Sequence, residues 1–210
     1  KAAAWLAGLA PLLSLAVLVW LTPAVMGGEI PRAMHEWLPQ AGLAFSLRLD
    51  GLGWMFSLMV LAIGALVVLY AHYYLGPQEK TRRFFCFLLL FMGAMLGMVL
   101  SGNLLLTVVF WELTSISSFL LIGFWFQRDD AREGARMALT ITAAGGLALL
   151  GGVVLIGRVV GSYELDAVLA AGDAIRAHQL YPWILGLVLA GVFTKSAQFP
   201  FHFWLPQAMA

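Results

Sequence analysis

The sequence contains a series of apolar runs whose length constrains the fold more than any other feature. A helix needs roughly 17–25 apolar residues to cross a hydrocarbon core about 30 Å thick. About six runs reach or nearly reach this length, and they cover residues 2–21, 52–75, 84–100, 104–126, 137–160 and 181–199. Hydrophobic residues make up 62% of the chain and charged residues 11%, whereas soluble domains average roughly 45–50% and 25%. The sequence therefore predicts an all-α polytopic membrane protein, and we interpret residues 1–210 as a fragment of one membrane-spanning domain.

The segments between the runs are polar and mostly short. Thr22–Asp50 is rich in proline, glycine and charge and is expected to form a loop. Residues 161–179 place acids among alanine and leucine, which favours a short surface helix. Ser101–Asn103 is so short a turn that the third and fourth runs must pack as an antiparallel pair.

The distribution of basic residues predicts an orientation. The loops 76–83 and 127–136 lie on the same side of the membrane as Lys1, and that side holds more lysine and arginine than the other. Short loops enriched in these residues face the cytoplasm. We therefore expect both loops to be cytoplasmic, in an integral protein of the bacterial inner membrane.

Several kinds of partner and site are not indicated. The net charge of +1 gives no sign of a nucleic-acid partner. Cys86 is the single cysteine, which excludes an internal disulfide framework and a thiolate metal cluster. We predict no cofactor and no metal site. The fifth run carries a set of glycines that we interpret as a packing face, because small residues let membrane helices approach closely; they are Gly145, Gly146, Gly151 and Gly152.

The last apolar run contains a lysine and a proline. Residues 191–210 read GVFTKSAQFPFHFWLPQAMA, which places Lys195 inside the run and Pro200 shortly after it. A lysine near the middle of a bilayer costs on the order of 2.5–3.5 kcal/mol. Proline lacks an N–H and crowds the carbonyl of Ser196, so we predict a discontinuous helix over Lys195–Pro206. Two interpretations stay open: an ion-pathway lysine at a broken helix, or a lysine that snorkels beside a packing kink.

One acid also lies deep in a run. Glu112 is about 13 Å along its helix from Asn103, at about 1.5 Å per residue, and so lies near the middle of the membrane. Lys195 is the natural partner, and at about 7 Å and an effective dielectric near 20 the attraction is roughly 2.4 kcal/mol. The alternative is a protonated glutamate with one structural hydrogen bond. The hydroxyl residues that follow could line a hydrated path or bond to their own helix backbone; they are Thr114, Ser115, Ser117 and Ser118.

Two stretches resemble one family. WELTSISSFLLIGF around Glu112 and TKSAQFPFHFWLPQAMA around Lys195 are similar to the antiporter-like membrane subunits. These comprise the A-type subunit of the Mrp-type multisubunit cation/proton antiporters and the large proton-pumping subunits of respiratory complex I. The resemblance covers roughly residues 49–210. It implies part of an inverted-repeat fold, in which Glu112 matches the fifth-helix glutamate and Lys195 the lysine of the discontinuous seventh helix.

The resemblance also implies a function. It implies a proton-translocating subunit of a multisubunit cation (sodium)/proton antiporter, with Glu112 and Lys195 as the translocation pair. Ser196, Pro200 and His202 are further candidates for the pathway, and His202 matches a histidine of the family motif. The implied partners are other membrane subunits, the lipid bilayer, protons and sodium. The rival interpretation is a proton-pumping subunit of complex I or a related redox complex, but many complex I members carry an acid on the helix between these two residues, and the run 137–160 has none.

Overall fold

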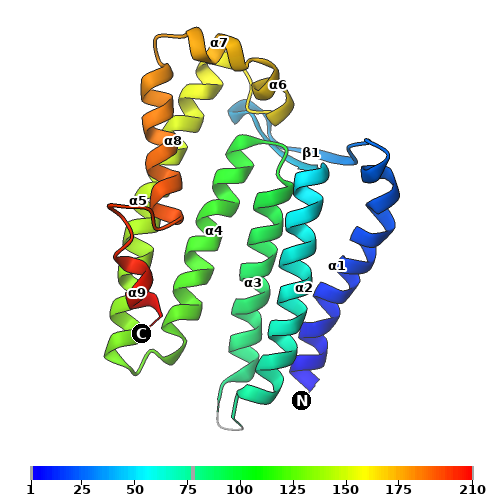
Figure 1. Ribbon diagram of the computed structural model, residues 1–210, viewed down its shortest axis with the longest axis vertical. Coiled ribbons are helices and arrows are strands. Elements are labelled where there is room, and N and C mark those ends of the chain that lie inside the picture. The colour runs from blue at the N-terminus through cyan, green and yellow to red at the C-terminus, as the bar shows by residue number, and fades with distance from the viewer. Residues whose placement is uncertain (1, 77–78, 210) are drawn as a thin grey trace.

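The computed structural model describes residues 2–76 and 79–209, and it is a bundle of long helices (Figure 1). Five helices are long and apolar enough to cross a membrane, which confirms the predicted polytopic helical class. They are α1 (Ala2–Met26), α2 (Gly51–Tyr74), α3 (Thr81–Leu100), α4 (Leu104–Ile122) and α5 (Asp129–Val160). The sixth apolar run forms α8 (Tyr181–Lys195), a helix of 15 residues that is shorter than a full span.

The connections alternate between the two ends of the bundle (Figure 1). The α2–α3 and α4–α5 connections lie at the end where the described chain begins, and a β-hairpin lies at the other end with α6 (Leu165–Ala170) and α7 (Gly172–Ala177). Lys1, Pro77 and Gln78, which contributed to the predicted orientation, lie outside the described residues. The cytoplasmic placement of the first end stays a prediction.

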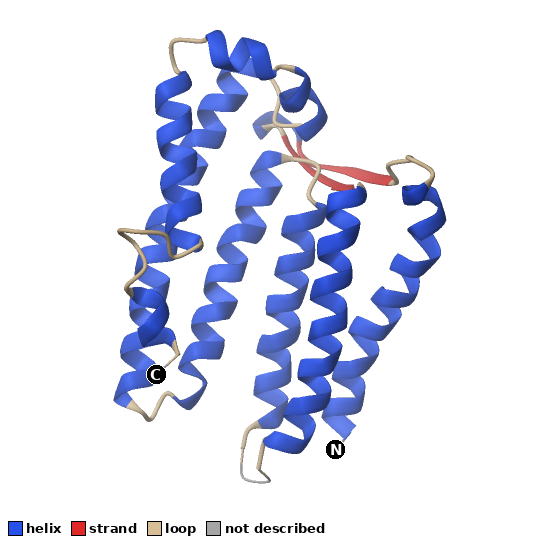
Figure 2. Ribbon diagram, in the orientation of Figure 1, coloured by secondary structure: helices blue, strands red, loops and turns tan. Residues whose placement is uncertain are grey.

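The segment Thr22–Asp50 is not simply the loop that we expected. It contains β1 (Arg32–Leu38) and β2 (Leu43–Arg48), joined through the 3-10 turn η1 (Pro39–Ala41) and paired antiparallel (Figure 2). Every residue of β1 is exposed, so this strand lacks the apolar alternation that would have revealed it. The hairpin is held in place by the α3–α4 turn, because Gly102 N donates to Ser46 O at 2.8 Å.

The same end of the bundle is tied together by Asn103. Its side-chain oxygen accepts from the backbone N–H groups of Leu105 and Leu106 and so caps α4. Its amide donates to Gly42 O at 3.0 Å and to Glu164 Oε1 at 2.8 Å. The turn that the sequence identified therefore also fixes the hairpin and the start of α6. Residues 161–179 hold the two short helices α6 and α7, not the single one expected.

Helix α5 begins earlier than predicted. Residues 129–136, expected to belong to a loop, form its first two turns. Asp129 and Asp130 lie in the first turn, where acids stabilise a helix N-terminus. Both acids also pair with arginines, Asp129 with Arg132 and Asp130 with Arg128. Local charge therefore extends the helix beyond its apolar run.

Candidate functional site at the end of helix α8

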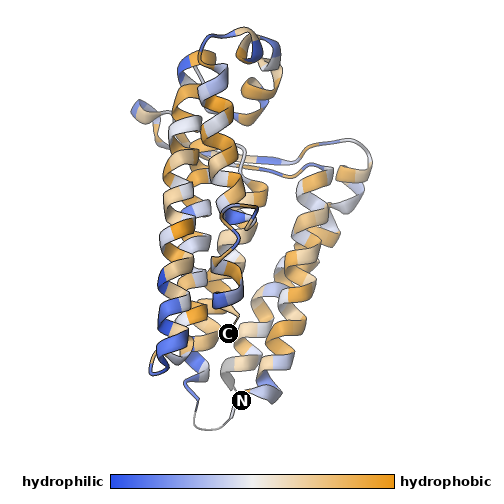
Figure 3. Ribbon diagram, turned by 60° about the vertical axis from the view of Figure 1, so that its left-hand side comes forward, coloured by the Kyte–Doolittle hydropathy of each residue, from blue (hydrophilic) through white to orange (hydrophobic). Residues whose placement is uncertain are grey.

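The site is built where α8 stops. Lys195 is the last helical residue, and α9 (Trp204–Ala208) begins only after a non-helical stretch. Figure 3 shows hydrophilic residues in this α8–α9 connection at mid-height of the bundle, beside apolar helices. The predicted discontinuity is therefore present. The helix stops at Lys195, where the discontinuity was predicted to begin, and Pro200 lies five residues further along the chain.

The helix ends in a hydrogen-bonded cap. Gln198 N donates to Phe193 O at 2.9 Å and Ala197 N donates to Thr194 O at 3.4 Å. Ala197 has a φ of 51°. This is the Schellman arrangement, in which the residue after the cap is left-handed and is usually glycine. Carbonyl groups at the interruption are thereby satisfied without water, as membrane depth requires.

The indole of Trp204 completes the cap. Its Nε1 donates to Thr194 O at 3.0 Å, so α9 bonds directly to the last turn of α8. Helix α9 also lies against α5, since a Cβ built on Gly134 would be 2.4 Å from Gln207 O. The interruption is thus a defined turn that packs on α5.

The Lys195 ammonium reaches across to α4. Its Nζ donates to Ser115 Oγ at 2.7 Å and to Trp111 O at 3.4 Å, and it lies 5.7 Å from the centroid of the Trp111 ring. Three features favour the positive charge here: two acceptors, an aromatic face and the C-terminal end of a helix. The Lys195 ammonium is therefore bound by groups of Trp111 and Ser115 on α4 and does not extend toward a membrane surface.

Glu112 lies on the same turn of α4, between the two residues that contact Lys195. Its Oε1 is buried and has no hydrogen-bond partner among the described protein atoms. Gly146 of α5 lies against it, since a Cβ at Gly146 would be 1.5 Å from Oε1. None of the ion pairs found among the described residues joins Glu112 to Lys195 within 4.0 Å. The Lys195 ammonium therefore lies beside the turn of α4 that bears Glu112 without forming an ion pair with it.

The hydroxyl residues after Glu112 mostly bond to their own helix. Thr114 and Ser115 Oγ donate to Trp111 O, and Ser117 Oγ donates to Leu113 O at 2.7 Å. Backbone bonding, one of the two interpretations left open by the sequence, accounts for Thr114 and Ser117. Ser115 differs because it also accepts from Lys195.

The other candidate pathway residues lie in the connection after α8. Ser196 Oγ donates to Val192 O at 2.7 Å, His202 stacks on Phe199 with ring centroids 5.8 Å apart, and all three of Ser196, Pro200 and His202 are exposed. Within the described residues no hydrogen bond joins them to Glu112 or Lys195. The residues that do contact the pair, Trp111, Ser115 and Gly146, were not singled out for that role. Only the i+3 position of Ser115 relative to Glu112 hinted at it.

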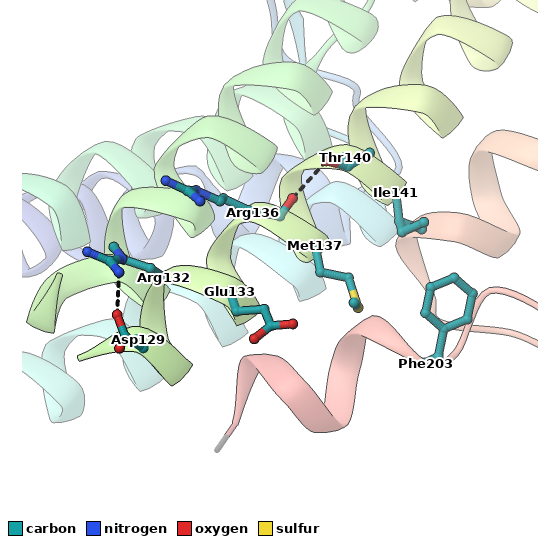
Figure 4. Close-up of a pocket in the computed structure, with 8 residues that line it drawn as sticks. All are labelled: Asp129, Arg132, Glu133, Arg136, Met137, Thr140, Ile141 and Phe203. Atoms are coloured by element: carbon teal, nitrogen blue, oxygen red, sulfur yellow. Dashed lines mark hydrogen bonds and ion pairs between the residues drawn. The ribbon is translucent and has the colours of Figure 1, made fainter. Parts of the chain in front are cut away.

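A separate groove of about 670 Å³ lies beside the first turns of α5 (Figure 4). It is lined by acids and bases at one end and by Met137, Ile141 and Phe203 at the other. Neither Glu112 nor Lys195 lines it. In the described part of the chain, no group of three or more His, Cys, Asp or Glu side chains could hold a metal ion.

The fold and the site together define a class: helical integral-membrane proteins in which an acid and a lysine lie inside the bundle, beside an interrupted helix. Residues 101–210 match the family model described as "NADH:quinone oxidoreductase/Mrp antiporter, TM". Residues 37–85 match the model described as "NADH-Ubiquinone oxidoreductase (complex I), chain 5 N-terminus". The chain belongs to the NADH:quinone oxidoreductase/Mrp antiporter family of membrane subunits.

Individual relatives agree with this assignment. The chain is 58% identical over 209 residues to a Rhizobium meliloti protein named as the probable A/B subunit of a K(+)/H(+) antiporter, covering 100% of this chain and 21% of that one. It is 44% identical over 205 residues to the A1 subunit of a Na(+)/H(+) antiporter of Staphylococcus aureus, covering 98% of this chain and 26% of that one. The chain thus spans about a quarter or less of the length of these curated relatives.

Solved structures share the fold. The Mrp complex from Dietzia sp. DQ12-45-1b contains a chain that superposes with a TM-score of 0.85 and 34% identity, over 99% of this chain and 22% of that one. A chain of an archaeal membrane-bound sulfane sulfur reductase superposes with a TM-score of 0.80 over 97% of this chain and 31% of that one. The second likeness, at 22% identity, concerns the fold alone.

Proposed function

We propose that this chain is the proton-translocating part of a subunit of a multisubunit cation (sodium)/proton antiporter, and that protons move along a polar axis that includes Glu112 and Lys195. One observation carries the proposal: the Lys195 ammonium donates to Ser115 at 2.7 Å, on the turn of α4 that bears Glu112. An acid and a base inside a membrane bundle mark ion pathways and proton relays. The names of the relatives support an antiporter complex.

The roles follow from the chemistry of the two groups. Lys195 would alternate between a protonated and a neutral form. The protonated form donates hydrogen bonds to Ser115 Oγ and to the Trp111 carbonyl. Glu112 would bias that exchange through its charge, because a carboxylate near an ammonium favours the charged form of both. The capped interruption after Lys195 would leave its ammonium beside polar backbone in place of a continuous apolar helix. Ser196, Pro200 and His202 would lie along the exposed part of the same route.

The second candidate function is a proton-pumping membrane subunit of a NADH:quinone oxidoreductase or a related redox complex. The family models support it as well, since the description of one names both kinds of complex and that of the other names complex I. What favours the antiporter is the surface of α5 next to the pair. Helix α5 presents Gly146 to Glu112, and its segment 137–157 carries no acid.

The partners we propose are other membrane subunits and a bilayer that surrounds the bundle. The proposed location is the bacterial plasma membrane, with the α2–α3 and α4–α5 connections in the cytoplasm. Protons and sodium would be the transported ions.

Proton movement in everted vesicles tests the proposal, with the variants carried in the complete complex. Glu112→Gln should assemble, because a neutral amide costs less to bury than an unpaired carboxylate, and transport should be largely lost. Glu36→Gln, on exposed β1, is the matched control and should transport normally. An imposed sodium gradient alone should drive proton movement. Normal pumping by Glu112→Gln would make the glutamate structural, and a requirement for an electron donor would favour the redox complex.

A further inference from the structure

Helix α5 packs against both of the elements that carry the charged pair. It packs against α4 on one side and α8 on another (Figure 1). Neighbouring residues of an α-helix point about 100° apart, because a turn holds about 3.6 residues. Two consecutive positions of α5 can therefore face its two neighbours, and positions 145 and 146 do so.

Both of these positions are glycines that make room for a polar side chain. A Cβ on Gly145 would lie 1.7 Å from Thr194 Oγ1, next to Lys195, and a Cβ on Gly146 would lie 1.5 Å from Glu112 Oε1. Cβ atoms essentially never approach another heavy atom closer than 3.0 Å. The volume that an alanine methyl would take at position 146 is thus already filled by the carboxyl group of the intramembrane acid.

Other glycines of α5 have a different environment. A Cβ on Gly152 would meet the apolar side chain of Val188 at 2.8 Å, and one on Gly151 would make only an ordinary contact of 3.5 Å with Leu187. These positions serve helix packing, as the sequence indicated for the whole set. Gly146 stands apart because the group that it accommodates is Glu112, whose Oε1 has no hydrogen-bond partner among the described atoms.

We propose that Gly146 is a positioning residue for Glu112, an inference that rests on the proposed function. Its missing side chain lets Oε1 of the carboxyl group point directly at α5, from the turn of α4 whose neighbouring residues contact Lys195. Oε1 accepts no hydrogen bond from the residues that the structure describes, so its position is set by steric contact with α5. An alanine would push Oε1 away by about 1.5 Å, the difference between 3.0 and 1.5 Å. In enzymes, a misplacement of about 1 Å can cost on the order of 100-fold in rate.

The test compares four variants of the complete complex in everted vesicles at matched expression: Gly146→Ala, Gly151→Ala, Glu112→Asp and the double variant Gly146→Ala/Glu112→Asp. Gly146→Ala should lower proton transport by about ten-fold or more, and Gly151→Ala should leave it near wild type. Aspartate is one methylene shorter, so its carboxyl withdraws from position 146. Glu112→Asp should itself lower transport, because its carboxyl is also displaced, and Gly146→Ala should lower transport by a much smaller factor in the Glu112→Asp background than in the wild type. A merely structural defect of α5 would not be relieved by changing the acid.

Each outcome supports or overturns the positioning role of Gly146. Transport by Gly146→Ala equal to that by Gly151→Ala, or the same fold-loss from Gly146→Ala in the wild-type and Glu112→Asp backgrounds, overturns the inference. If Gly146→Ala fails to assemble, recovery of assembly by Glu112→Asp supports the inference and no recovery overturns it. Glu112→Gln separates the two proposals: if it transports normally the proposed function fails, whereas an inactive Glu112→Gln with an active Gly146→Ala refutes only the positioning role.

Discussion

Replacing Ala197 by glycine should stabilise the interruption that places Lys195. Ala197 has a φ of 51°, in the left-handed region, directly after the cap of α8. An L-residue with a Cβ pays about 1–2 kcal/mol for this conformation. Glycine avoids that cost but adds about 0.4–1 kcal/mol of unfolded-state entropy. The net gain in the free energy of opening the cap is about 1 kcal/mol. It should slow hydrogen exchange at the two amides that close the cap, those of Ala197 and Gln198.

Hydrogen exchange of the assembled complex in lipid vesicles measures this gain. The Gln198 amide, which donates to Phe193 O at 2.9 Å, reports on opening of the cap. Because 1.4 kcal/mol corresponds to a factor of ten, the gain predicts exchange about five-fold slower in Ala197→Gly. Ala190→Gly is the matched control with the opposite sign, since glycine inside a helix costs about 1 kcal/mol, and residue 190 lies within α8. Unchanged or faster exchange at Gln198 in Ala197→Gly would refute the idea that the α8 cap is strained at this residue.

Two further predictions concern the lysine contact and the orientation. Ser115→Ala removes a hydrogen bond to a charged donor worth about 1.5–3 kcal/mol and should lower proton transport at least several-fold. Ser117 is also buried but bonds only to α4 carbonyls, so Ser117→Ala should not lower transport. Equal transport rates of the two variants would exclude a role for the Ser115 contact. Single cysteines at Glu79 and Gln127, in a background lacking Cys86, should be shielded in intact cells from an impermeant thiol reagent, and one at Glu29 should react; the reverse pattern would invert the proposed topology.

The bundle itself was predictable because bilayer thickness sets the length of each apolar run. Glu112 and Lys195 could also be chosen from the sequence, since a charge deep in such a run is expensive and seldom accidental. The start of α5 was missed because its first turns are charged and owe their helical form to Asp129 and Asp130 at the N-terminus. The hairpin was missed because β1 is exposed throughout and has no apolar alternation.

The surroundings of the pair could not be predicted for a different reason. Whether Ser115 or Ser117 faces Lys195 depends on the rotation of α4 relative to α8, which hydropathy does not specify. The same holds for Gly146, which the sequence could only group with the packing glycines. Proline marked the interruption, yet the helix ends at Lys195 through a cap on Ala197, a residue with no sequence preference for the left-handed conformation.

In the proposed function, Lys195 loses and regains a proton during transport. Arginine keeps the positive charge and is effectively never neutral in a protein, so Lys195→Arg separates proton exchange from electrostatic anchoring. The measurement is proton uptake by vesicles that contain the complete complex with Lys195→Arg or Lys195→Ala, at matched expression. We predict that both variants assemble and that arginine abolishes transport as fully as alanine does. Transport by Lys195→Arg well above that of Lys195→Ala would show that Lys195 acts only as a fixed charge and that the proton takes another route.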